Sequence, residues 1–159
     1  MTGKADFTDE EWTLLREAPT SAGMLVIQAD RGGVIRETFS MAKAYTEARR
    51  EHGASQLLDD IVSEKPEVDR TRVASPGELR ANLLQHIRDA VGLLSEKATP
   101  EELTEYRRFL TNVASRVAEA HREGFLGMSG ERVSDAERQA LADIADAASA
   151  DGSDTKTTE

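Results

Sequence analysis

One recurring spacing marks four helix starts in this sequence. A serine or threonine is followed three residues later by glutamate in four pairs: Thr8 and Glu11, Ser75 and Glu78, Thr99 and Glu102, and Ser134 and Glu137. At this spacing the hydroxyl accepts a hydrogen bond from the third helical N–H, and the carboxylate accepts one from the N-cap N–H. We therefore expect a helix to begin at each pair, and an all-α fold.

Proline supports two of these starts. Pro76 and Pro100 directly follow their cap residues, at the first helical position, where the fixed φ of proline is suitable and its missing N–H is not needed. Apolar residues at steps of three and four extend the two helices over about 76–97 and 100–123. Because only Ala98 and Thr99 separate them, we expect an antiparallel helical hairpin.

The first third of the chain is predicted to hold a short helix and a buried one. The short helix begins at the Thr8 cap, with Phe7 positioned to pack on its first turn, and Pro19 is expected to end it. Residues 20–29 are apolar with almost no polar face, which is typical of a buried helix. A short strand is the alternative for such a run. We favour the helix, because the capping signals elsewhere leave no partner strand.

Three further helices complete the predicted fold. They cover about 34–52, a shorter stretch around 57–62, and 135–148, and a polar loop over 63–74 separates the second from the hairpin. The sequence thus predicts a single-domain all-α bundle of about six to seven helices.

The two ends of the chain are predicted to lie outside this bundle. Residues 1–7 are expected to be a flexible N-terminal segment, and residues 8–148 form the helical domain. Residues 149–159 are polar and of low complexity, so they cannot bury enough apolar surface to become ordered.

Composition narrows the range of functions. The chain has 159 residues, no cysteine and a net charge of −10, from 30 acidic and 20 basic residues. Without cysteine, disulfides, thiolate catalysis and cysteine-ligated zinc are excluded. The negative charge opposes binding to nucleic acid phosphates. The sequence shows no signal peptide and no apolar run long enough to span a membrane, so we expect a cytoplasmic protein.

An apolar segment between two predicted helices is a candidate binding surface. Residues 124–130 hold three glycines around Phe125, Leu126 and Met128. These large side chains either plug the open end of the bundle or anchor a partner protein, whether another protein or a second copy of the chain. A ligand cradle is a third alternative. The segment is not a phosphate-binding loop, because the lysine of that motif is absent.

Two acidic turns resemble a known family. Residues 29–37 and 130–137, with Leu141 and Ile144 after the second, are similar to the two halves of the pattern found in TerB-like proteins, a helical family linked to tellurite resistance. In that family a helix ends in an acidic-glycine turn, and an acidic residue opens the next helix. The resemblance implies an all-helical bundle, a divalent-cation site near the turns, and a role in stress response beside partner proteins.

The carboxylates at these turns are the candidate metal ligands. Asp30 and Glu37 flank the first turn, and Glu131 and Asp135 lie at the second. Carboxylate oxygens are ligands that Ca²⁺ and Mg²⁺ accept, although the spacing matches no EF-hand loop. Helix-capping and turn roles explain the same side chains without a metal. A divalent cation is therefore one alternative, and no cofactor at all is the other.

No catalytic residues are predicted. The three histidines, His52, His86 and His121, fall in different predicted helices and form no recognised catalytic motif. His86 and His121 are expected to lie at the rim of the core. We therefore expect a non-enzymatic protein-interaction or stress-associated module. The alternative is a TerB-like stress-response protein that binds a divalent cation.

Overall fold

The computed structural model describes residues 1–29, 42–43, 45–47, 50, 55–66, 75–124 and 134–149. Every regular element in these ranges is helical: the 3-10 helix η1 (Lys4–Asp6), α1 (Asp9–Ala29), α3 (Gln56–Ser63), α4 (Pro76–Lys97), α5 (Pro100–Gly124) and α6 (Asp135–Ser149). Residues 42–43, 45–47 and 50 are also helical. The predicted all-α, single-domain bundle is confirmed, as are the helices predicted near 57–62, 76–97, 100–123 and 135–148.

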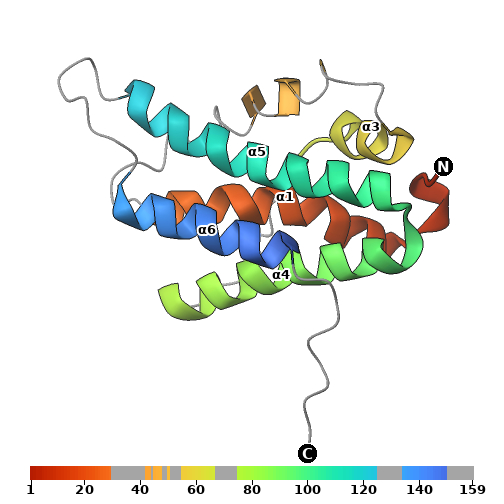
Figure 1. Ribbon diagram of the computed structural model, residues 1–159, viewed down its shortest axis with the longest axis horizontal. Coiled ribbons are helices and arrows are strands. Elements are labelled where there is room, and N and C mark those ends of the chain that lie inside the picture. The colour runs from red at the N-terminus through yellow and green to blue at the C-terminus, as the bar shows by residue number, and fades with distance from the viewer. Residues whose placement is uncertain are drawn as a thin grey trace, which may run out of the picture.

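The bundle is built around α1. This helix packs mainly on α4 and α5, and α6 contacts all three. In Figure 1, α5 and α4 run in opposite directions along two sides of the molecule, with α1 and α6 between them. The predicted hairpin is therefore present but open, because its two helices pack mostly on α1 and α6 rather than on each other. The short helix α3 lies at the periphery, against α5.

All four predicted capping boxes are formed. The backbone N–H of the cap residue donates to the glutamate at 2.8 Å for Thr8, 3.1 Å for Ser75, 2.9 Å for Thr99 and 2.8 Å for Ser134. The reciprocal bonds, from the glutamate N–H to the cap hydroxyl, measure 3.2 to 3.4 Å. A further cap without a glutamate begins α3, where the Ser55 hydroxyl accepts from the Leu58 N–H at 3.3 Å.

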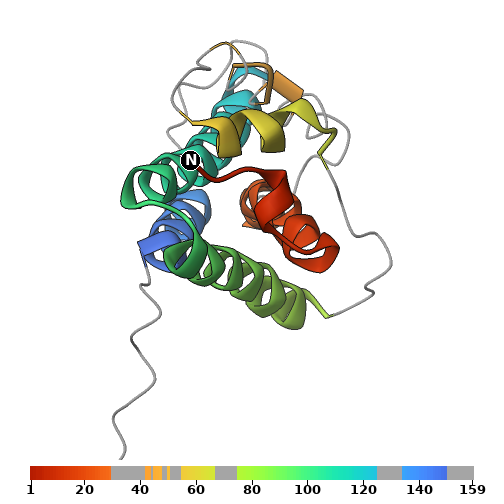
Figure 2. The ribbon, with the colours of Figure 1, turned by 90° about the vertical axis from the view of Figure 1, so that its right-hand side faces the viewer.

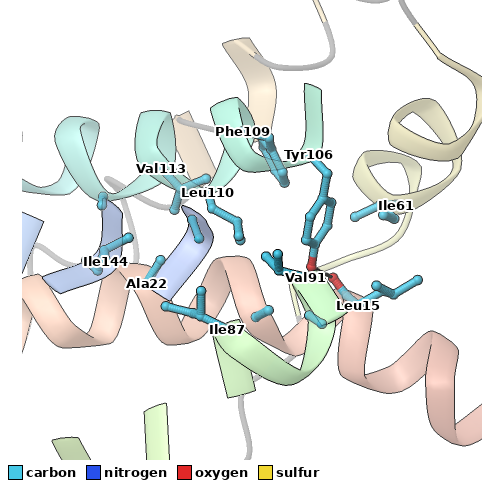
Figure 3. Packing of buried hydrophobic residues seen from close by; sticks show 14 of the residues in the cluster. Leu15, Ala22, Ile61, Ile87, Val91, Tyr106, Phe109, Leu110, Val113 and Ile144 are labelled. Carbon is cyan, nitrogen blue, oxygen red and sulfur yellow. Dashed lines mark hydrogen bonds between the residues drawn. The ribbon is translucent and has the colours of Figure 1, made fainter. Parts of the chain in front are cut away.

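The prediction that Pro19 ends the first helix is wrong. Pro19 lies inside α1, which continues to Ala29 as one helix. Proline has no N–H, so the carbonyl of Leu15, four residues earlier, loses its helical partner. The hydroxyl of Tyr106 on α5 donates to this carbonyl at 2.8 Å and points toward it in Figure 3. This contact supplies the missing donor, which explains how the helix tolerates proline.

The predicted helical and buried character of residues 20–29 is confirmed, although they form the second half of α1 rather than a separate helix. Leu25 and Val26 belong to the main core. That core is continuous through α1, α4, α5 and α6 (Figure 3), and its fully buried members include Leu15, Ile87, Val91, Tyr106, Leu110, Val113 and Ile144. Among the described helices, none has both the length and the apolar composition needed to cross a membrane.

Candidate functional site

Most of the sequence-predicted site residues lie outside the described residues. Asp30, Glu37 and Glu131 are among them. Asp135 itself opens α6 with a side chain that is 99% exposed, and its carboxylate pairs with Arg138 at 2.9 Å. In the part of the chain that the structure describes, no three histidine or carboxylate side chains are grouped in a way that could hold a metal ion.

The predicted anchor residues Phe125, Leu126 and Met128 also lie outside the described residues. The helices on either side of them in the chain are described. The helix α5 ends at Gly124 and α6 begins at Asp135, and these two helices pack on each other. The start of α6 is fixed by its capping box, in which Glu137 is 5% exposed. The chain between Gly124 and Asp135, which includes the apolar segment, therefore connects two helices that pack on each other.

His86 occupies the rim of the core, as predicted. It is half-buried on α4, and its Nδ1 lies 3.4 Å from the hydroxyl of Ser21 on α1. The structure describes neither His52 nor the side chain of His121. The Ser21 side chain is 4% exposed, so this serine is out of reach of a substrate.

A group of polar contacts that the sequence did not indicate surrounds residues 1–7, the segment predicted to be flexible. Thr2 is 7% exposed, and both of its donors bind the Glu102 carboxylate, which is 6% exposed. The Thr2 backbone N–H reaches Oε1 at 2.7 Å, and its hydroxyl reaches Oε2 at 2.7 Å. Glu102 thus serves two purposes, because it also caps α5 through Thr99.

The next residues are held by α3. The backbone N–H of Lys4 donates to Asp60 at 3.2 Å, and its ammonium contacts Glu64 at 2.6 Å. Gly3 lies close to the same helix: a Cβ built on it would meet Nε2 of Gln56 at 3.2 Å. Figure 2 shows the segment between α3 and the start of α5. We call the four side chains that lie against this segment, Gln56, Asp60, Glu64 and Glu102, the N-terminal seat.

Two side chains of α1, Trp12 and Arg16, contact Glu64 of the N-terminal seat. The indole N–H of Trp12 donates to Glu64 at 3.0 Å, and the Arg16 guanidinium lies 3.0 Å from the other oxygen of that carboxylate. Phe7 packs on Trp12 with ring centroids 5.9 Å apart, which is the hydrophobic staple expected at this helix start. The Lys4 ammonium lies 5.7 Å from the centre of the indole ring.

Two carboxyl groups of the seat have shifted pKa values. Burial raises the pKa of Glu102, but the hydrogen bonds from the Thr2 and Thr99 backbone N–H groups outweigh burial, and the net pKa is below its ordinary value. For Glu64, the hydrogen bonds from the Lys4 ammonium and then the Trp12 indole lower the pKa. Both groups are therefore ionised near neutral pH and act as hydrogen-bond acceptors.

Local sequence patterns could identify only part of this arrangement. The capping box accounts for Glu102, and the staple accounts for Phe7 and Trp12. No spacing rule links Thr2 to Glu102, because the two residues are 100 positions apart.

Comparisons of the chain with protein-family models, curated proteins and solved structures find no match.

Proposed function

We propose that this chain is a non-enzymatic protein-interaction module that acts in the cytoplasm, and that Phe125, Leu126 and Met128 anchor its partner. The observation that supports the proposal is the attachment of this segment between α5 and α6, two helices that pack on each other. Binding residues are commonly carried by loops that a rigid scaffold positions. Large apolar side chains are effective anchors at the centre of protein interfaces.

The chemistry of the described core agrees with this role. The buried carboxylates of Glu102 and Glu137 both accept hydrogen bonds in capping boxes. For Glu102, the hydrogen bonds from the Thr2 and Thr99 backbone N–H groups outweigh burial and keep the pKa below its ordinary value, so this carboxylate is ionised near neutral pH and has no proton to donate as a general acid. These two groups therefore stabilise helix starts and fit a structural role better than a catalytic one.

An affinity capture from native lysate tests the proposal. The full chain is the bait, beside a double variant in which Phe125→Ser and Leu126→Ser remove the anchor. A second double variant, Glu101→Ser and Asn112→Ser, changes exposed positions on α5 and is the matched control. We expect the anchor variant to lose partners that the wild type and the control both retain. If the anchor variant keeps its melting temperature and the same partners, the anchor proposal is wrong. Light scattering separates self-association from binding of another protein.

The second candidate function is divalent-cation binding of the TerB-like kind. It is supported by the observed start of α6, where a capped helix opens on an acidic residue, Asp135, as in the second half of the family pattern. Titration of Ca²⁺, Mg²⁺ and Zn²⁺ while following the melting temperature tests it. Binding to the folded state raises the melting temperature by mass action, and Asp30→Asn with Asp135→Asn should abolish the rise. No shift at millimolar metal would exclude this candidate.

A further inference from the structure

Residues 1–7 are bound to the helical body in the way that a peptide is bound to a receptor. The segment is short, and the body binds Thr2 and Lys4 with different groups. Glu102 accepts both donors of Thr2, Asp60 accepts the backbone N–H of Lys4, and Glu64 pairs with the Lys4 ammonium. These contacts join parts of the chain that are 56 to 100 positions apart.

Each of these contacts selects a kind of residue. The two oxygens of Glu102 require an N–H and a hydroxyl on one residue, which only serine or threonine supplies with this geometry. At Gly3 the backbone is extended, and a side chain would press against Gln56. Glu64 favours a cation one residue further on, since the Lys4 ammonium contacts its Oε1 at 2.6 Å while Arg16 contacts the other oxygen. The seat thus matches the extended sequence threonine, glycine, lysine.

We propose that the N-terminal seat is a peptide-binding site that residues 1–7 occupy in cis, and that it takes in trans an extended threonine-glycine-lysine segment of a partner protein. Charge supports a basic ligand. The seat presents three carboxylates, Asp60, Glu64 and Glu102, to a segment whose only cationic side chain is Lys4. This inference rests on the proposed interaction role and adds a second surface to it.

The cis segment regulates this site by competition. A tethered ligand has an effective concentration in the millimolar range, so a free peptide of the same sequence competes poorly while the tether is bound. Weakening the cis contacts should raise the apparent affinity for the free peptide, because the free site becomes more populated. The contacts of Thr2 and Lys4 are the ones to weaken.

The experiment uses the full chain with Thr2→Val and Lys4→Glu, called the released variant. The ligand is a synthetic peptide of residues 1–7, acetylated and amidated. Trp12 is the single tryptophan, and its indole N–H donates to Glu64, so its NMR resonance in the labelled chain reports binding. We expect the released variant to bind the peptide at least about tenfold more tightly than the wild-type chain.

Matched substitutions test the site itself. Adding Glu102→Gln to the released variant should weaken peptide binding about tenfold. One carboxylate oxygen becomes an amide N–H₂ group, which faces the backbone N–H or the hydroxyl of the peptide threonine and cannot accept a hydrogen bond from it. Adding Glu101→Gln, an exposed neighbour on α5, should leave it unchanged. Lys4→Ala alone is the milder release if the double variant does not fold, since the Lys4 side chain is 57% exposed.

Two results would overturn the inference. The first is absence of binding by a folded released variant at millimolar peptide, and the second is equal binding by wild-type and released chains. Neither result bears on Phe125 and Leu126, because the peptide assay does not use that segment. Conversely, loss of the lysate partners in the Phe125 and Leu126 variant leaves the peptide assay unaffected. The two proposals can therefore fail separately.

Discussion

The helices α4 and α5 begin with the same local motif but have different surroundings. Each has a capping box with proline at the first helical position, Ser75 to Glu78 in α4 and Thr99 to Glu102 in α5. Glu78 is exposed and its carboxylate contacts only its own cap residue among the described residues. Glu102 is buried and also binds both donors of Thr2.

This difference separates what a short sequence motif specifies from what the fold adds. The motif alone determines where both helices start, because its hydrogen bonds join residues three positions apart. Burial and the bonds to Thr2 depend on how distant segments pack. The same glutamate substitution should therefore have different consequences in the two boxes.

The largest expected effect comes from Glu102→Gln. The amide keeps one acceptor but turns its N–H₂ group toward a donor of Thr2, which leaves a buried polar group unpaired. We expect a loss of about 1.5–3 kcal/mol in the free energy of unfolding, the usual range for a hydrogen bond to a charged group. Urea denaturation followed by circular dichroism measures it.

Glu78→Gln is the matched control for this comparison. Glutamine also functions in a capping box, and the exposed site lets water replace any lost contact. We expect a clearly smaller loss than for Glu102→Gln. Equal losses for the two variants would show that the bonds to Thr2 add nothing to the local motif.

The pH dependence of stability should also differ between Glu102→Gln and the wild type. Burial favours the neutral Glu102 carboxyl, but the bonds from Thr2 and Thr99 prevail, and the folded pKa lies below the ordinary value of 4.5. The folded state therefore binds this proton less tightly than the unfolded state. The contribution of the ionised Glu102 carboxylate to the free energy of unfolding is complete well above pH 4.5. It is lost as the pH falls through the folded pKa.

Stability measured against pH checks this expectation. The difference in unfolding free energy between the wild type and Glu102→Gln should be constant near neutral pH and shrink in acid. The Lys4 ammonium and the Arg16 guanidinium face the nearby Glu64, and both are unchanged in the variant. A difference that persists undiminished at the lowest pH would contradict the role given to the Glu102 charge.

Proline positions make a second comparison, between α1 and α5. Pro100 opens α5, where no N–H is needed, whereas Pro19 lies inside α1 and relies on the Tyr106 hydroxyl. Tyr106→Phe leaves the buried Leu15 carbonyl without this donor. We expect a loss of about 1–2 kcal/mol in the free energy of unfolding.

Tyr45→Phe is the control for Tyr106→Phe. Burial raises the pKa of Tyr45 to about 12, against a smaller opposing effect of the Thr20 side chain, and its buried hydroxyl forms no hydrogen bond of normal geometry with Thr20 or any other described residue. Removing that hydroxyl should therefore change stability little. In a Pro19→Ala background, which restores the helical donor to Leu15, Tyr106→Phe should cost less. An unchanged cost there would refute the link between Tyr106 and the proline.

These comparisons explain how much of the molecule the sequence could predict. The starts of α4, α5 and α6 follow from Ser75, Thr99 and Ser134, because capping is local. The continuity of α1 through Pro19 was not predictable, because the compensating donor comes from Tyr106, which is 91 residues from its acceptor. The N-terminal seat was missed for the same reason: the residues that bind Thr2 and Lys4 are distant in the sequence.

The smallest expected effect compares two glycines. A Cβ on Gly92, inside α4, would meet no atom within 4 Å, whereas one on Gly3 would meet Gln56 at 3.2 Å. Gly92→Ala should stabilise the protein by about 0.5–1 kcal/mol, because alanine loses less backbone entropy in a helix. Gly3→Ala should give no such gain, since the new methyl group must displace a side chain of the seat. Thermal denaturation of both variants measures the difference between their stabilities. Destabilisation by Gly92→Ala would contradict the expectation that a methyl group at this position of α4 meets no neighbouring atom.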